Sequence, residues 1–220
     1  FLPGLKGQDL IVTDGTSVLG ADDKAGVAEI MTLAARLMAP DAPEHCAVSI
    51  GFTPDEEIGR GADLFNVADF HADYAYTVDG GALGELEYEN FNAAAAQVKV
   101  RGVNIHPGSA KNQMKNALLI GMEFNGMLPA WETPAHTEGY EGFYHLCEMQ
   151  GDEELTTLSY ILRDHDADKL EQKKETMRRI AAYLNQKWGE GTVEVTIRDS
   201  YRNMREMLEP HMEIVDKAKD

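Results

Sequence analysis

The sequence has few cysteines, no long apolar run and a shortage of basic residues, and each absence excludes a class of protein. Cys46 and Cys147 lie far apart in apolar surroundings, which favours buried free thiols in a reducing cytoplasm over a disulfide. No apolar stretch approaches the roughly 20 residues that span a bilayer. Lysine and arginine number 20 against 38 aspartates and glutamates, giving a net charge of -18. Such a chain is poorly suited to phosphates or anionic lipids, so we expect neither nucleic-acid nor membrane partners.

The first 90 residues have the pattern of an α/β protein. Three short segments have the composition of strands, namely Asp9–Val12, Ala47–Phe52 and Tyr74–Val78, and each leads into a turn. Between the first two, Lys24–Met38 repeats apolar residues at helical spacing. Strands alternating with a helix predict a mostly parallel sheet.

The pattern changes near residue 90 to that of a small α+β domain. The expected elements are a strand over Phe91–Arg101, a helix over Asn112–Leu128, a hairpin of Gly142–Gln150 and Leu155–Arg163, a helix over Asp168–Trp188 and a strand over Thr192–Ile197. The order β-α-β-β-α-β is the ferredoxin-like arrangement. We therefore predict a partial α/β domain over 1–90, an inserted domain over 91–203 and a return to the first domain over 204–220.

Acidic residues flanked by glycine follow the predicted strands in three loops. These loops read G-A-D-D-K-A-G (Gly20–Gly26), T-P-D-E-E-I-G (Thr53–Gly59) and Y-T-V-D-G-G (Tyr76–Gly81). Loops at the carboxyl ends of neighbouring strands meet at one edge of an open α/β sheet. Carboxylates crowded there repel each other unless cations neutralise them, and one carboxylate can bridge two metal ions. Asp22 has the position that such a bridge requires.

Each loop also has a simpler interpretation. Asp22 or Asp23 could cap the helix that follows, Pro54 could begin another helix, and the residues around Asp79 could form a plain turn. Taken alone, each simpler interpretation is favoured. Three acidic loops in corresponding places of one α/β unit favour a metal-dependent hydrolase instead.

Several motifs, considered together, resemble one known family. Besides the acidic loops these are H-P-G-S-A-K, E-G-Y-E-G-F-Y-H-L and S-Y-x-N-M-R-E. Together they are similar to the co-catalytic di-zinc exopeptidases, a family that includes carnosinase-like dipeptidases, and the similarity covers essentially the whole chain. The segments Glu138–Leu146 and Ser200–Glu206 resemble the tripeptide aminopeptidases of that family more narrowly. The resemblance implies a partial catalytic domain with an inserted lid and dimerisation domain.

The resemblance also implies roles for the acidic residues. Asp22 would bridge two zinc ions in each subunit of the complete enzyme, and the peptide bond after it would be cis. Glu57 and Asp79 would each bind one of the zinc ions. Glu56 would act as the general base on the attacking water, and the reaction would release the N-terminal residue of a tripeptide.

The lid would contribute three further residues to substrate binding. By resemblance, His106 supports the oxyanion, often in the partner subunit's site, and Asn116 and Arg163 contact the substrate. A guanidinium suits the C-terminal carboxylate of a peptide because it pairs with both oxygens. The simpler interpretations are a loop hydrogen bond for His106, a polar helix position for Asn116 and an exposed charge for Arg163. The implied partners are small peptides and a second copy of the chain, paired through the lid.

Two features of the family have no counterpart in the sequence. The family's first metal motif, a histidine and an aspartate on an early strand, and its last histidine ligand are both missing. The chain also begins at Phe1, so we expect an internal fragment of a cytoplasmic peptidase that is inactive alone, because carboxylates without imidazole suit zinc poorly. The alternative is a non-catalytic module that only dimerises.

Overall fold

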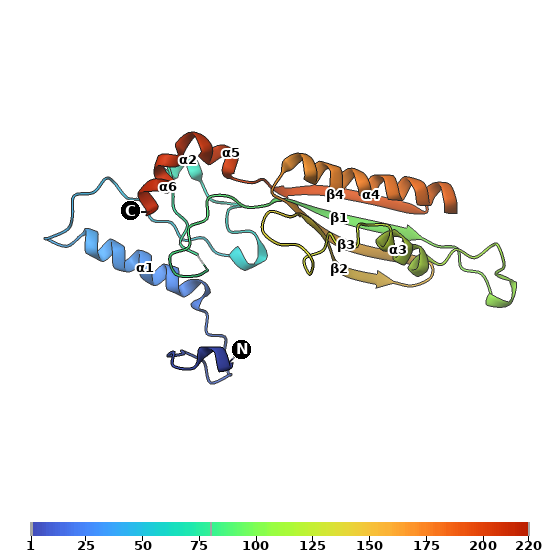
Figure 1. The fold of residues 1–220 in the computed structure, drawn as a ribbon, viewed down its shortest axis with the longest axis horizontal. Coiled ribbons are helices and arrows are strands. Elements are labelled where there is room, and N and C mark those ends of the chain that lie inside the picture. Colours follow the sequence, from blue (N-terminus) through green and yellow to red (C-terminus); the bar gives the residue numbers. More distant parts are fainter. Residues whose placement is uncertain (1, 80, 220) are drawn as a thin grey trace. The chain divides into compact units, whose positions relative to one another are not determined.

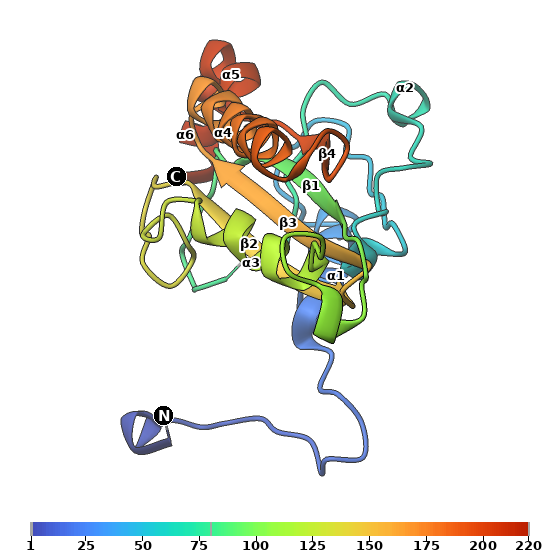
Figure 2. The same ribbon diagram turned by 90° about the vertical axis from the view of Figure 1, so that its right-hand side faces the viewer.

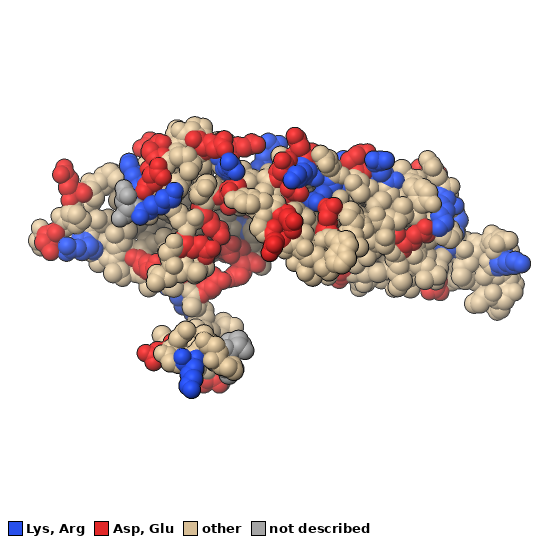
Figure 3. Space-filling model, viewed as in Figure 1, with Lys and Arg blue, Asp and Glu red and all other residues tan. Residues whose placement is uncertain are grey.

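The chain forms two compact units in a computed structural model that describes residues 2–79 and 81–219 (Figure 1). The first unit comprises residues 2–86 and the second residues 87–218. Among the described residues, no helix has the length and apolar character needed to cross a bilayer. Acidic side chains recur over the visible faces of both units, in keeping with the net charge (Figure 3).

Residues 92–201 of the second unit form a four-stranded antiparallel sheet and two α-helices. In chain order these elements are β1 (Asn92–Arg101), α3 (Ala117–Gly126), β2 (Phe143–Gly151), β3 (Leu155–Asp164), α4 (Ala167–Trp188) and β4 (Val193–Tyr201). The strand order is β2-β3-β1-β4 with every neighbouring pair antiparallel. The predicted ferredoxin-like β-α-β-β-α-β arrangement is confirmed.

Both helices pack on the same face of this sheet, where the core lies (Figures 1 and 2). Alternate residues of β1 are buried, as expected for a sheet with one covered face: Ala94, Ala96, Val98 and Val100. Leu158, Tyr160 and Leu162 of β3 extend the same layer. Phe124 of α3 and Met177 of α4 are fully buried against it, so local periodicity and packing agree throughout this unit.

The first unit differs from the prediction. It contains η1 (Leu2–Leu5), α1 (Ala21–Leu37), η2 (Glu56–Ile58) and α2 (Val67–Phe70), and its described residues include no strand. The strands expected at 9–12, 47–52 and 74–78 are therefore wrong for this structure, as is the parallel sheet. A strand needs a neighbour to pair its backbone groups and a layer to cover its apolar side chains. Ile11, Val12 and Phe52 have neither and remain 84%, 77% and 51% exposed.

The chain after β4 forms α5 (Arg205–Leu208), η4 (Glu209–His211) and α6 (Met212–Lys219). Helical structure therefore covers 205–219. The assignment of 204–220 to the first domain stays a prediction.

Candidate active site

Asp22 and Asp23 have different surroundings at the start of α1, although they are adjacent in sequence. Both depart from helical dihedral angles, and the peptide bond between them is cis, as the resemblance implied. The Asp23 carboxylate accepts a 3.0 Å hydrogen bond from the Gly26 amide, a donor that the first helical turn cannot pair internally. Asp23 therefore caps the first regular turn of α1.

The segment that carries Asp79 runs against the first turn of α1. Gly26 is buried there, and a Cβ atom at its position would lie 2.2 Å from the Val78 carbonyl oxygen. Only glycine permits this approach of two backbones, which explains one glycine of the first acidic loop. The contact brings Asp79 towards Asp22. Gly80, in the same motif, lies outside the described residues.

Carboxylates from all three loops interact at this place. The pKa of Asp79 is raised above its ordinary value of 3.8, chiefly by partial loss of hydration. The negative charges of Asp23 and Asp22 raise it further, as do a side-chain hydrogen bond with Asp22 and the charge of Glu57. The acidic loops thus approach one another without the sheet edge that was expected to align them.

Glu56 and Glu57 lie in the short helix η2. The residues at its two ends, Asp55 and Gly59, have positive φ angles of 64° and 69°, and Asp55 makes no side-chain capping bond. The alternative of a helix with Pro54 at its first position therefore does not describe this loop. Within residues 2–79 and 81–219, no group of three or more histidine, cysteine or acidic side chains is arranged to hold a metal ion. The carboxylates are close together but do not form a ligand set.

His106 precedes η3 (Pro107–Ser109) in the loop after β1. Its Nδ1 atom accepts a 3.1 Å hydrogen bond from the Gly108 amide. Because an amide can only donate, the neutral ring carries its proton on Nε2. The ring is exposed, so His106 presents an N–H donor to its surroundings.

His106 and Asn116 line the same hollow, which has a volume of about 690 Å³. Glu153, from the β2–β3 turn, also lines it. The Asn116 side chain caps α3 by accepting a 3.1 Å hydrogen bond from the Leu119 amide. The Asn116 side-chain oxygen is therefore occupied by the helix cap, which is a structural role. Only its NH₂ group is left for a ligand.

Arg163 is remote from this hollow. It lies near the end of β3, where it pairs with Ala93, and its guanidinium donates to the Leu162 carbonyl at 2.9 Å and lies 5.2 Å from the centre of the Tyr201 ring. The opposite end of the β1–β3 ladder, Arg101 paired with Leu155, leads to His106. Eight strand residues at about 3.3 Å each separate the two ends by about 26 Å. The structure thus brings Asn116 to His106 but not Arg163.

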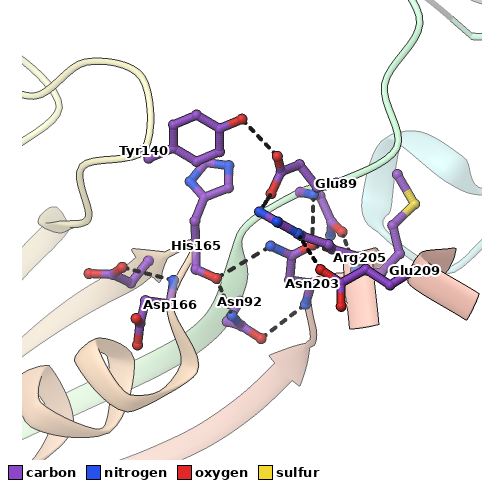
Figure 4. Close-up of polar contacts among 11 residues, drawn as sticks. Glu89, Asn92, Tyr140, His165, Asp166, Asn203, Arg205 and Glu209 are labelled. Atoms are coloured by element: carbon purple, nitrogen blue, oxygen red, sulfur yellow. Dashed lines mark hydrogen bonds and ion pairs between the residues drawn. The ribbon is translucent and has the colours of Figure 1, made fainter. Parts of the chain in front are cut away.

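Sequence reasoning missed a polar cluster around Glu89, shown in Figure 4. Glu89 accepts a hydrogen bond from Tyr140 and forms an ion pair with Arg205. Both partners belong to the two segments with the narrower resemblance. The motifs in those two segments were the only sequence signal for this cluster. Nothing in the sequence indicates that the two segments contact each other.

The fold and the comparisons together define the class of this chain. Residues 88–192 match the family model of the peptidase dimerisation domain. Over nearly its whole length the chain is similar to peptidase T, as the motifs suggested. It is 60% identical to "Peptidase T" of Desulfitobacterium hafniense (strain DSM 10664 / DCB-2) over 96% of this chain and 52% of that protein. It is 58% identical to "Peptidase T" of Clostridium perfringens (strain ATCC 13124) over 99% of this chain and 53% of that protein.

A solved structure supports the fold. The crystal structure of aminopeptidase PepT from Bacillus cereus ATCC 10987 aligns with a TM-score of 0.72 at 21% identity, covering 94% of this chain and 57% of that one. The chain therefore spans about half the length of the relatives that it matches.

Proposed function

We propose that the full-length protein containing this chain is a cytoplasmic metallo-aminopeptidase that releases the N-terminal residue of tripeptides. The observation that carries the proposal is the 60% identity to a peptidase T across 96% of the chain. The effect of the Asp22 and Glu57 carboxylates on Asp79 supports it, because carboxylates that act on one another are typical of hydrolytic metal sites.

In this proposal Glu56 is the general base and accepts a proton from the attacking water. His106 supports the oxyanion through its Nε2–H group, which the Gly108 amide holds in the donor form. Arg163 pairs with the C-terminal carboxylate of the peptide, and Asn116 contributes its NH₂ group.

The carboxylates described above do not by themselves fit zinc. They supply oxygen ligands only, and zinc in proteins is usually held by histidine or cysteine as well. Asp22, Glu57 and Asp79 would therefore need imidazole ligands from elsewhere in the full-length protein to hold the two zinc ions that the resemblance implies. When bound, such ions polarise a carbonyl group and acidify water.

We further propose that the protein works as a homodimer joined through β2. The two sheet edges are β2 and β4, and β4 carries the charged residues Glu194, Arg198 and Asp199, which discourage pairing. Beside β2, helix α3 exposes Leu119 and Met122, which are 63% and 58% accessible. A peptidase dimerisation domain is consistent with this arrangement.

A dimer would also resolve the separation of His106 and Arg163. Three residues of extended peptide span only about 10 Å, so one tripeptide cannot touch both residues of one copy across about 26 Å. Each site would take Arg163 from one copy and His106 from the other.

The test is cleavage of a tripeptide by the purified full-length protein, with the N-acetylated tripeptide as control. We expect cleavage of the free tripeptide only, and loss of activity with a chelator. Equal cleavage of both peptides would contradict an aminopeptidase. Absence of cleavage with intact dimers would favour the alternative, a module that only dimerises.

A further inference from the structure

Glu89 connects two segments that are distant in sequence. Its side chain is 12% exposed, accepts a 2.7 Å hydrogen bond from the Tyr140 hydroxyl and lies 3.5 Å from the Arg205 guanidinium (Figure 4). Tyr140 belongs to the loop before β2, and Arg205 begins α5 after the last strand. Removing one of the two partners of a nearly buried carboxylate costs free energy, because the charge is then left incompletely paired.

A second layer of hydrogen bonds joins the same segments beside Glu89. The amides of Asn203 and Met204 donate to the side-chain oxygens of Asn92 and Asn90, at 2.9 Å and 2.8 Å. The side chains of Asn92 and Asn203 both donate to the His165 carbonyl oxygen. The chain entering β1 is thus bonded directly to the chain leaving β4.

Aromatic packing covers this polar layer. The His165 ring lies 4.1 Å from the Phe91 ring and 4.8 Å from the Tyr140 ring, measured between centroids. Its Nδ1 atom is buried without a hydrogen-bond partner. Tyr140 therefore contributes both a hydroxyl to Glu89 and a ring that closes the cluster.

We propose that Glu89, Tyr140 and Arg205 form a clasp that positions the sheet domain by fixing its incoming and outgoing connections to each other. The clasp begins two residues after the boundary between the units, which falls between Leu86 and Glu87. With both connections tied, residues 89–205 move as one body and bending is confined to the chain outside the clasp. The idea that this motion orients His106 and Arg163 rests on the proposed function. The clasp itself does not depend on that function.

Amide hydrogen exchange, measured by NMR on the 220-residue chain, tests the clasp. Tyr140→Phe keeps the ring but removes the donor to Glu89. We expect the Asn203 and Met204 amides to exchange about tenfold faster in this variant than in the unmodified chain. Loss of a hydrogen bond to a charged group shifts the equilibrium between closed and open states by about that factor. The amides of Val98 and Leu158 in the sheet core should keep their rates. Tyr183→Phe, at an exposed tyrosine of α4, is the matched control and should change neither pair.

Unchanged exchange at Asn203 and Met204 would overturn the clasp. Equal acceleration in the sheet core would also overturn it, because that result indicates general destabilisation. Arg205→Lys provides a second variant: it keeps the charge and should accelerate the two amides less than Arg205→Met. None of these outcomes depends on peptidase activity, so failure of the clasp and failure of the proposed function are distinguishable.

Discussion

Asp79 and Asp22 interact through their carboxyl groups, so side chains from two separate loops meet beside the first turn of α1. The charge of Asp23 also acts on Asp79, while its carboxylate accepts a hydrogen bond from the Gly26 amide. The pairing is the structural reason to expect a functional site in the first unit, since adjacent carboxylates repel each other at neutral pH.

The first prediction is that Asp22→Asn lowers the pKa of Asp79. In the unmodified chain that pKa lies above 3.8, first because of partial loss of hydration and then because of the charges of Asp23 and Asp22. A raised pKa means that the folded state binds this proton more tightly than the unfolded state. The resulting stabilisation is complete below pH 3.8 and is lost as the pH rises through the raised value. Carboxyl NMR titration of the 220-residue chain measures the change.

Asp14 is the matched control for this titration. Its pKa is lowered by a hydrogen bond from the Thr16 side chain, and the acidic loops are not among the causes of its shift. Asp22→Asn should leave it unchanged. An Asp79 pKa at or below 3.8 in the unmodified chain would exclude the close carboxylate pair.

The second prediction concerns Glu56 in the full-length protein. Glu56→Gln should lower kcat by about 10²–10⁴-fold, because an amide cannot accept the proton of the attacking water. Glu56→Asp, which keeps a carboxylate on a shorter side chain, should retain more activity. Elemental analysis of both variants should show the metal content of the unmodified protein. Near-normal turnover of Glu56→Gln would remove Glu56 from the role of base.

The sheet domain could be predicted from the sequence because its periodicity is local. The alternation along Ala94–Val100 and the apolar stripe of α4 each specify a face, and packing unites those faces in one core. The first unit could not be predicted in this way, because the strands expected there are absent from its described residues. Segments such as Asp9–Val12 have strand composition, but a strand also needs a neighbour, and local composition does not supply one.

The sequence predicted which loops form the candidate site, but not how the side chains within them pair. Adjacent residues Asp22 and Asp23 have the same chemistry, and only the local backbone decides that Asp23 caps the helix. The contact of Tyr140 with Glu89 joins positions 51 residues apart, and no short-range pattern encodes it. Side-chain pairing between distant segments depends on the folded chain.

The third prediction is that His106→Ala in the full-length protein lowers kcat by about 10²–10³-fold with little change in KM. Loss of one preformed donor to an oxyanion has an effect of this order on the transition state and little effect on substrate binding. His136→Ala is the control, because His136 bonds Thr133 and packs on Trp131 and does not line the His106 hollow. Unchanged kinetics for His106→Ala would leave that histidine with its loop hydrogen bond alone.

The fourth prediction separates a binding role of Arg163 from its structural contacts. Arg163→Ala in the full-length protein should raise KM more for a free tripeptide than for the C-terminal amide, because only the former offers a carboxylate to the guanidinium. Arg198→Ala, at an exposed position of β4, should affect both substrates little. Equal losses on the two substrates would indicate that Arg163 acts only through Leu162 and Tyr201.

The last prediction is that the clasp stabilises the second unit at neutral pH and ceases to do so in acid. The pKa of Glu89 is lowered from its ordinary value of 4.5, first by the Tyr140 hydrogen bond, against partial desolvation, and further by Arg205, Asn203 and His165. A lowered carboxyl pKa contributes stability that is present above pH 4.5 and is lost as the pH falls through the folded-state value.

Tryptophan fluorescence follows this unit selectively, because Trp131 and Trp188 are the only tryptophans of the chain and both belong to it. Tyr140→Phe should lower the urea midpoint at pH 7, and the difference from the unmodified chain should shrink as the pH falls below 4.5 and Glu89 takes up its proton. Tyr183→Phe should follow the unmodified chain at every pH. A Tyr140→Phe deficit that is equal at pH 7 and pH 3 would assign the stabilisation to ring packing against His165 and not to the Glu89 charge.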